Sequence, residues 1–210
     1  MATLQGVYTA SVLDNRDRED LARVLVRVPG VADTGIWARV ATMMAGRNRG
    51  TMFIPDIGDE VLVAFEHGDP RLPFVIGALW NGKDQPPVSG ADAATTRMIR
   101  SRSGVTFRID DKVTSLVIET PGGQRITLQD GPGTVRIEDD NGNSMTLATT
   151  GVTVTASAKV TVNAATVELN AGMVTVNAGM SRFSGVVQCD TLIANSVAAA
   201  SYTPGAGNVW

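Results

Sequence analysis

The sequence predicts an all-β chain with a compact N-terminal part and a repetitive C-terminal part. Short runs of β-branched and apolar residues, such as Glu60–Phe65 (EVLVAF), lie between glycine, proline and aspartate turns. From Gly104 onward, alternating runs of about six residues recur every 7 to 10 residues. Only 5% of the residues are aromatic and 22 of 210 are glycine, a composition typical of thin, repetitive β-structure.

The N-terminal part begins with three expected strands, at residues 5–13, 22–28 and 36–43. The loop DNRDRED between the first two carries several carboxylates. Arg16 and Arg18 interrupt them, and the glycine and final glutamate of a calcium loop are missing, so a solvated connection is the favoured interpretation. In the loop 44–51 (MAGRNRGT), Arg47 and Arg49 are equally consistent with solvated side chains and with a grip on an anion or on a partner's acidic rim.

The fourth and fifth strands are expected at Glu60–Phe65 and at residues 73–80 (PFVIGALW). Gly77 lies inside the fifth, and a glycine within a strand indicates a bulge, as at the corner of a small closed barrel. Residues 83–96, rich in proline and small polar side chains, read as a linker, and the next strand is expected at residues 98–100.

Nine alternating runs follow the linker. They are VTFRID, SLVIET, QRITLQD, TVRIED, SMTLAT, GVTVTA, KVTVNA, TVELNA and MVTVNAG. A single chain of valine, threonine and alanine has too little apolar surface to offset the entropy of ordering it. Three chains wound together, with strands from different chains alternating up each face, would enclose the apolar side chains and leave no free edge. A single-chain β-solenoid is the alternative.

Residues 181–210 break this repeat. The alternation in GVVQCDTLIANSV favours further strands over a short helix at residues 192–200. The ending SYTPGAGNVW places aromatic residues among turn-formers, which suits either a frayed tail or a shaped tip. The candidate tip residues for binding a partner are Tyr202, Pro204, Gly205, Gly207, Asn208 and Trp210.

Motifs in the first ninety residues resemble a known family. The order W-x-R-V, F-x-P-x-x-G-D-E-V-L-V-x-F, G-D-P, P-x-V-x-G-x-L-x-N-G and P-P is similar to that of the oligonucleotide/oligosaccharide-binding (OB) barrel of contractile-tail spike proteins. That family includes phage baseplate assembly protein V, the VgrG spike of type VI secretion and, with the closest resemblance, the short spikes of extracellular contractile injection systems. The resemblance implies a five-stranded OB-fold barrel followed by an intertwined trimeric β-helix, a three-sided prism.

The expected domains are therefore the barrel (residues 1–87), a linker (88–103), a spike shaft (104–200) and a tip (201–210). The resemblance implies a structural central spike that docks on a separate hub protein, carries a tip protein of the PAAR-repeat type and pierces a target membrane mechanically when a sheath contracts. We expect a homotrimer. We also expect it to be made in the cytoplasm, because residues 1–10 lack a signal peptide's basic and apolar regions. Such a protein belongs to a phage tail or a phage-tail-like particle.

Two other function classes are weaker. A nucleic-acid or carbohydrate binding module would need a basic groove with stacking aromatics, whereas the net charge is −3 and most barrel aromatics are expected in the core. An enzyme is disfavoured because the one histidine, His67, sits in a turn and no nucleophile motif is present. Glu60 and Glu66 would lie about 20 Å apart along a strand, too far for paired carboxylate chemistry. No catalytic residue, metal or cofactor is therefore expected, and the single Cys189 reads as a small hydrophobic residue.

Overall fold

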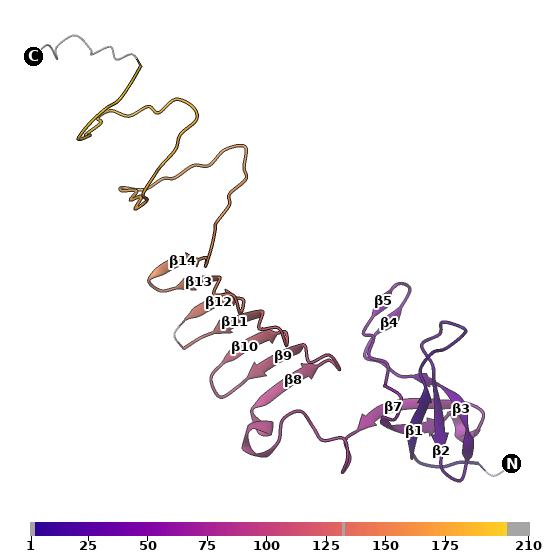
Figure 1. Cartoon of the computed structure of the whole chain (residues 1–210). Coiled ribbons are helices and arrows are strands. Elements are labelled where there is room, and N and C mark those ends of the chain that lie inside the picture. The colour runs from indigo at the N-terminus through magenta and orange to yellow at the C-terminus, as the bar shows by residue number, and fades with distance from the viewer. Residues whose placement is uncertain (1–2, 132, 201–210) are drawn as a thin grey trace, which may run out of the picture. The chain divides into compact units, whose positions relative to one another are not determined.

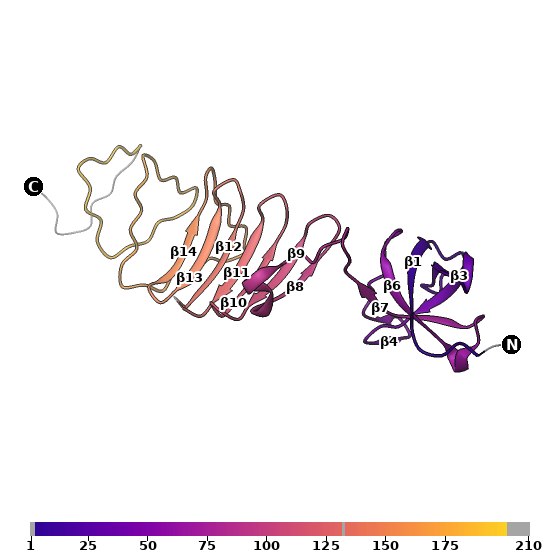
Figure 2. The ribbon, with the colours of Figure 1, turned by 90° about the horizontal axis from the view of Figure 1, so that it is seen from below.

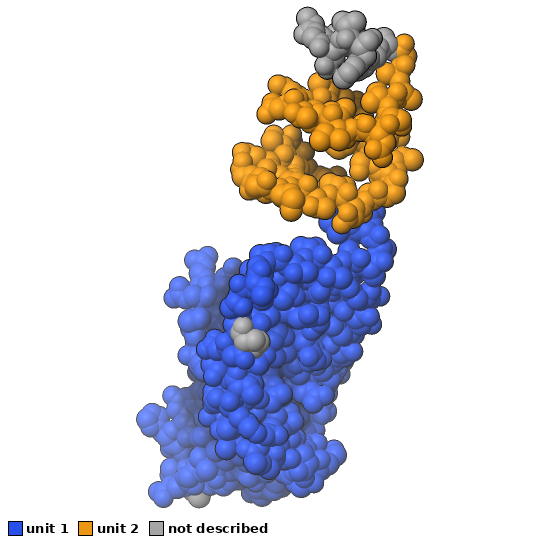
Figure 3. Space-filling model, turned by 90° about the vertical axis from the view of Figure 1, so that its left-hand side faces the viewer, with its two compact units in different colours: residues 1–160 blue, residues 161–210 orange. Residues whose placement is uncertain are grey.

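The computed structural model describes residues 3–131 and 133–200. The chain divides into two compact units, Met1–Val160 and Thr161–Trp210, which are coloured separately in Figure 3. Within the described residues, regular structure consists of β-strands and two short 3-10 helices, η1 (Glu66–Gly68) and η2 (Gly90–Ala94). The predicted all-β class is confirmed.

Five strands close into a barrel at the N-terminal end of the chain (Figures 1 and 2). They are β1 (Tyr8–Asp14), β2 (Val24–Val28), β3 (Ala32–Val40), β6 (Glu60–Phe65) and β7 (Pro73–Leu79). The order is β1-β2-β3-β7-β6, and β6 pairs antiparallel with β1 to complete the ring. The β3–β7 pair is parallel, and the other pairs are antiparallel. The five predicted strands and the OB-like barrel are therefore confirmed.

Alternation along the strands fills the barrel with valine. Because successive side chains of a strand point to opposite faces, every second residue of β2 lies inside, and Val24, Val26 and Val28 are fully buried. Strand β6 contributes Val61 and Val63 in the same way. Among the described residues, the buried core consists of Ala10, Val12, Val24, Val26, Val28, Ala38, Val61, Val63, Phe65 and Val75. Ten residues of this size make a self-sufficient core for a small barrel.

A β-bulge in β7 lies where the glycine predicted it. Leu62 of β6 pairs with Gly77, whereas the next residue, Val63, pairs with Val75, so Ile76 is left as the extra residue. A bulge bends its strand and increases its local twist. This bend lets β7 pair with β6 along its length and with β3 at its N-terminal end.

A short hairpin projects from the barrel between β3 and β6 (Figure 1). Its strands β4 (Ala45–Gly46) and β5 (Arg49–Gly50) have two residues each. The hairpin lies in the stretch that was expected to be a loop. It was not predicted because strands of two residues are too short to show a periodic pattern in the sequence.

Beyond the barrel, seven strands form one antiparallel sheet in which each strand pairs with the next along the chain (Figure 2). They are β8 (Thr96–Arg100), β9 (Thr106–Asp110), β10 (Ser115–Glu119), β11 (Arg125–Gln129), β12 (Thr134–Glu138), β13 (Ser144–Ala148) and β14 (Gly151–Thr155). Neighbouring strands over residues 96–155 thus belong to the same chain, contrary to the expectation that strands of different chains alternate there. A meander of this kind also excludes the single-chain solenoid for this stretch.

The first six alternating runs of the repeat are strands, whereas the last three are not. Residues 156–200 carry no strand within the chain and are exposed almost throughout. Alternation persists there in Val160 and Val162, Val167 and Leu169, and Val174 and Val176. A strand needs a hydrogen-bonding neighbour, and the described part of this chain offers none to these runs.

The loop between β1 and β2 is built around one carboxylate. Asp17 accepts hydrogen bonds from the backbone N–H groups of Glu19, Leu21 and Arg23 and from the Arg23 guanidinium at 2.8 and 2.9 Å. Its side chain is only 4% exposed. Hydrogen bonding to Arg23, above all, and to the backbone holds the pKa of Asp17 well below its usual range. The loop is a connection between strands, as expected, and not a calcium loop. Asp17, however, is a buried structural anchor and not a solvated side chain.

We predict that Asp17→Asn lowers the barrel's thermal unfolding midpoint by several degrees at pH 7. A carboxylate whose folded pKa is depressed stabilises the folded state above its unfolded pKa, about 3.9, and loses that effect as the pH falls further. The difference between variant and wild type should stay constant from pH 7 to about 5 and shrink below pH 4. Calorimetry of the full chain measures this, with exposed Asp20→Asn as the matched control. A pH-independent difference down to pH 3 would contradict the role given to the charge.

Candidate functional site

The sheet β8–β14 exposes its apolar face and partly covers its polar one. In β9, Phe107 and Ile109 are exposed, whereas Thr106, Arg108 and Asp110 on the opposite face are half-buried. Strands of a globular sheet show the reverse pattern, apolar inward and polar outward. The inverted pattern marks this face as the candidate functional surface.

Two cross-strand ladders of apolar side chains make up that face. The first ladder, in register from β8 to β14, is Ile99, Phe107, Ile118, Ile126, Ile137, Met145 and Val154. The second, from β9 to β14, is Ile109, Leu116, Leu128, Val135, Leu147 and Val152. Apart from half-buried Leu116, the exposed fractions run from 37% for Ile118 to 62% for Val152. Fully burying one side chain of this size stabilises by about 1.5–3 kcal/mol, so the uncovered ladders hold a large reserve of burial.

Ion pairs run along the opposite face. Arg125 of β11 donates to Glu119 of β10 at 2.8 Å, and Arg136 of β12 donates to Glu138 on its own strand at 2.7 Å. The hydrogen bond to Glu119 raises the pKa of the Arg125 guanidinium. Pairs this exposed contribute little stability each, about 0–1 kcal/mol. Their effect is to keep charge on one face of the sheet.

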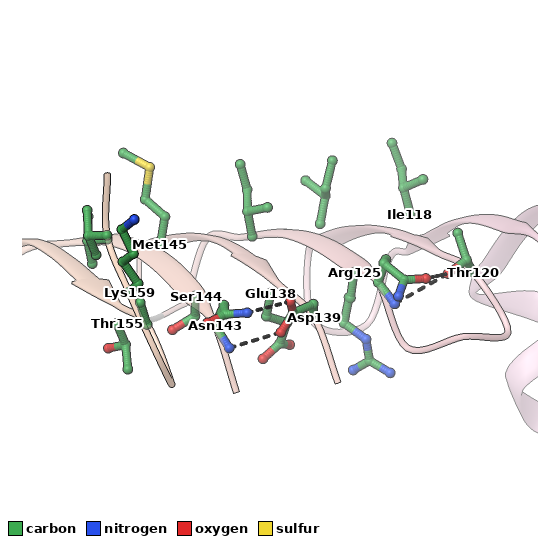
Figure 4. Close-up of a pocket in the computed structure, with 16 residues that line it drawn as sticks. Ile118, Thr120, Arg125, Glu138, Asp139, Asn143, Ser144, Met145, Thr155 and Lys159 are labelled. Atoms are coloured by element: carbon green, nitrogen blue, oxygen red, sulfur yellow. Dashed lines mark hydrogen bonds between the residues drawn. The ribbon is translucent and has the colours of Figure 1, made fainter. Parts of the chain in front are cut away.

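A shallow hollow of about 650 Å³ lies over strands β10–β14 (Figure 4). Figure 4 shows Ile118 and Met145 pointing to one side of the sheet while the Arg125 side chain points to the other. Ile118, Ile126, Ile137, Met145 and Val154 of the first ladder line the hollow. Its turn-side wall is held by Asp139, which accepts hydrogen bonds from the backbone and side-chain nitrogens of Asn143 at 2.9 and 2.8 Å. A floor of aliphatic side chains suits packing against another apolar surface better than recognition of a polar ligand.

The predicted tip residues, Tyr202, Pro204, Gly205, Gly207, Asn208 and Trp210, lie outside the described residues.

The barrel aromatics are less buried than expected. Phe65 is in the core and packs edge-on against half-buried Tyr8, with ring centroids 5.4 Å apart. The prediction that most of the others are core residues was wrong for Phe53 and Trp80, which are 65% and 70% exposed. Alternation shows which residues share a face but not whether anything covers that face. Exposure of Phe53 and Trp80 thus marks two further surfaces that sequence reasoning missed.

Arginines cover the remaining two aromatic rings of the barrel. The Arg23 guanidinium lies 5.8 Å from the centroid of half-buried Trp37, and Arg39 lies 5.3 Å from that of Phe74. Arg23 is also bound to Asp17, so its charge is already compensated.

The candidate catalytic side chains do not form a site. His67 lies in η1 with φ at 50°, and Glu60 and Glu66 begin β6 and η1 respectively. Among residues 3–131 and 133–200, no three of the histidine, cysteine, aspartate and glutamate side chains are placed to hold a metal ion together. No helix in the described part of the chain has the length and apolar character needed to cross a membrane.

Two family models match separate parts of the chain. Residues 8–80 match the type VI secretion system/phage-baseplate injector OB domain, which is the five-stranded barrel. Residues 115–180 match the phage baseplate V C-terminal trimerisation domain, which includes β10–β14 and the first two dozen residues after them. Together the two matches cover well over half of the chain.

Individual relatives are spike proteins of type VI secretion. The chain is 39% identical over 71 residues to spike protein VgrG1a of Pseudomonas aeruginosa, which is 34% of this chain and 11% of that protein. It is 33% identical over 106 residues to VgrG4b of the same organism, 50% of this chain and 10% of that one. A third relative, the actin cross-linking toxin VgrG1 of Vibrio cholerae, is 32% identical over 74 residues, 35% of this chain and 7% of the toxin. The chain therefore matches about a tenth of the length of these relatives.

Proposed function

We propose that this chain, which belongs to the contractile-tail spike family of phage baseplates and type VI secretion systems, is the structural central spike of a contractile injection apparatus. The observation that carries the proposal is the inverted sheet β8–β14, with its two apolar ladders exposed. The ladders support a homotrimer, as does the match to a trimerisation domain. Three sheets with their ladders facing a common axis would bury all three apolar faces at once.

A trimer of this kind suits mechanical work. Seven strands at about 4.8 Å spacing stack to about 29 Å, and every step along the stack is a ladder of backbone hydrogen bonds. In such a trimer the ladders of β9–β14, which carry no charged side chains, would face inward and make the inner side of each sheet dry. The ion pairs would face outward and keep the outer side solvated. We propose that such a shaft transmits force along its axis and pierces a target membrane when a sheath contracts. Two of the matched relatives are named as spike proteins of type VI secretion, which supports this role.

The barrel is the end that we propose docks on a separate hub or baseplate protein. It folds around its own core, so its outer surface is available for contacts with other proteins. We further propose that the protein is made in the cytoplasm and becomes part of a phage tail or phage-tail-like particle. The proposed role is structural and not enzymatic, and the match to the toxin VgrG1 covers only 7% of that protein.

We predict that Ile126→Asp abolishes the trimer. Ile126 lies in the middle of the first ladder between Ile118 and Ile137, so the variant would place three unpaired carboxylates in one dry interior, each costing several kcal/mol. Sedimentation of the full chain should give a trimer for wild type and a monomer for the variant.

The matched control is Thr127→Asp. Thr127 is the next residue along β11, on the opposite face, with Arg136 as its register partner. This variant should sediment as a trimer. A monomeric but folded wild-type chain, or equal loss of the trimer in both variants, would refute the proposed assembly.

The second candidate function, a nucleic-acid or carbohydrate binding module, has one observation in its favour, the exposed aromatic rings of Phe53 and Trp80. The sequence carries 21 acidic against 18 basic residues, which is a poor electrostatic match to phosphate. We predict no salt-dependent retention of the full chain on immobilised single-stranded DNA at 50 mM to 200 mM salt, the range over which phosphate contacts weaken steeply. Retention that falls with salt and is lost in Trp80→Ala would favour the binding module instead.

We also propose that the C-terminal residues 202–210 seat a small capping protein of the PAAR-repeat type. Three copies of Tyr202 and Trp210 would present aromatic groups, which are common anchors of protein interfaces. A metal-binding apex would need imidazole, thiolate or carboxylate side chains, and the sequence has none of these after Asp190.

Deleting residues 202–210 should leave the trimer intact and remove the cap from assembled particles. Sedimentation of the isolated protein and composition of the purified particles measure the two effects separately. A truncated spike that keeps its cap, or a stoichiometric metal ion in the isolated full-length trimer, would contradict this tip assignment.

A further inference from the structure

The hairpin that projects from the barrel carries an uncovered apolar surface. We call residues 42–53, which include β4 and β5, the arm. Four large side chains on it are exposed: Met43 at 88%, Met44 at 52%, Met52 at 77% and Phe53 at 65%. Contiguous apolar surface on a soluble protein commonly marks a contact with another molecule. The exposed side chains therefore indicate that the arm contacts another molecule.

The arm is held in one shape, although it is exposed. The Thr42 hydroxyl lies 2.6 Å from the Thr51 hydroxyl, and the Thr51 N–H donates to the Met44 carbonyl at 3.0 Å. Gly50 has φ at 153°, and a Cβ there would lie 2.5 Å from the Met44 carbonyl oxygen, so only glycine fits. A surface preorganised in this way loses little conformational entropy when it binds.

The tip of the arm is positively charged. Arg47 lies in the turn of the hairpin and Arg49 begins β5. Neither forms an ion pair within the described residues, in contrast to Arg23 and Arg71, which are bound to Asp17 and Asp69. Two unpaired guanidinium groups beside an apolar surface match a partner that offers carboxylates around an apolar floor.

Such a surface exists on the same barrel, where β6 begins and β7 ends. We call it the socket. It is a hollow of about 360 Å³ with Leu79 and Trp80 as its apolar part and the carboxylates of Asp59, Glu60 and Asp84 around it. Trp80 is 70% exposed there.

The carboxylates of the socket differ in how they are occupied. Asp59 accepts a hydrogen bond from the Asp56 N–H and Glu60 accepts one from Asn81, whereas the Asp84 side chain has no hydrogen bond or ion pair among the described residues. Glu60 and Asp84 also line the neighbouring hollow, where Arg27 and Lys83 lie, but neither of these cations forms an ion pair with them within the described residues. Asp84 is therefore the carboxylate most available to an incoming cation.

We propose that the arm of one protomer docks in the socket of the next protomer around the threefold axis. This inference rests on the proposed trimer and adds a second interface to it. The arm and the socket share no residues, and no ion pair joins them within the described part of one chain, so each is open to another copy. Charge and apolar character are complementary between them, with arginine and methionine on one side and carboxylate and tryptophan on the other.

Threefold symmetry makes this pairing closed. The arm and the socket are different surfaces, so their contact is head-to-tail, and three such contacts complete a ring and leave none unsatisfied. The shaft would already hold the three barrels together, so each arm meets its socket at a high effective concentration. A contact too weak to join free barrels is then sufficient to fix their orientation.

Cross-linking of the full chain tests this inference. In a Cys189→Ser background, Arg47→Cys and Asp84→Cys are combined and treated with a short bismaleimide, since a paired arginine and aspartate hold their Cα atoms further apart than a disulfide allows. We expect a denatured band at three times the 22.0 kDa chain mass. Arg47→Cys combined with Arg16→Cys, whose side chain is 85% exposed on the loop after β1, is the matched control and should give no such band.

The outcomes separate this inference from the proposed trimer. A chain that sediments as a trimer but stays uncross-linked, or whose two thiols react within one chain, would overturn the arm and socket and leave the spike standing. Cross-linking by Arg47→Cys alone would show instead that arms meet one another, and cross-linking to a different protein in assembled particles would assign the arm to that partner; both results overturn the inference. A monomeric native chain would refute the proposed function itself.

A charge exchange gives a second readout. Arg47→Glu combined with Arg49→Glu should weaken the cross-linked interface and lower the barrel's thermal unfolding midpoint in the trimer. Adding Asp84→Arg should restore part of the loss, because the charges are then complementary again. If adding Asp84→Arg lowers the unfolding midpoint further, the pairing is overturned, because the arginines of the arm and the carboxylate of the socket are then not in contact.

Discussion

The rest of this structure depends on one constraint: nothing in the described part of the chain covers the apolar face of the sheet β8–β14. Its ladders of isoleucine, leucine and valine remain more than a third exposed along nearly the whole sheet, while the charged side chains of the other face pair with one another. Water is a poor solvent for such a face, and hydrogen bonding between strands does nothing to remove that cost. Association is therefore a condition of the sheet's stability and not an addition to a finished fold.

The barrel obeys the opposite rule. Its ten buried residues form a closed core, and its strands pair around a full ring, so it needs no second chain to fold. The same chain thus joins a barrel with its own core to a sheet that is stable only when it associates with other chains. In the proposed spike, this division would separate the part that presents specific contacts from the part whose regular packing carries load.

Period-2 alternation allowed much of the fold to be predicted, and its limits explain the errors. Runs such as TFRID and RITLQ were recognisable because each strand has five residues with strict alternation and a turn at either end. Closure of the barrel by the parallel β3–β7 pair has no local signal, and here it came from the resemblance to a family. Exposure of Trp80 and Phe53 was missed because alternation does not reveal what covers a face. The alternating runs after Thr155 have no hydrogen-bonded neighbour in the described part of this chain, so their strands stay a prediction for the trimer.

The nearest-neighbour pairing of β8–β14 also bears on how such a molecule is put together in time. Contacts between consecutive strands close loops of only a few residues, and local contacts of this kind form quickly and with little loss of chain entropy. The valine pairs beyond Thr155 have no such shortcut, because they must wait for other chains. The register between these strands is therefore set within one chain, by the short turns that join them, although the sheet becomes stable only when its apolar face is covered. In the proposed trimer, the slowest step of folding would then be the meeting of three chains, and the rate of that step would depend on chain concentration.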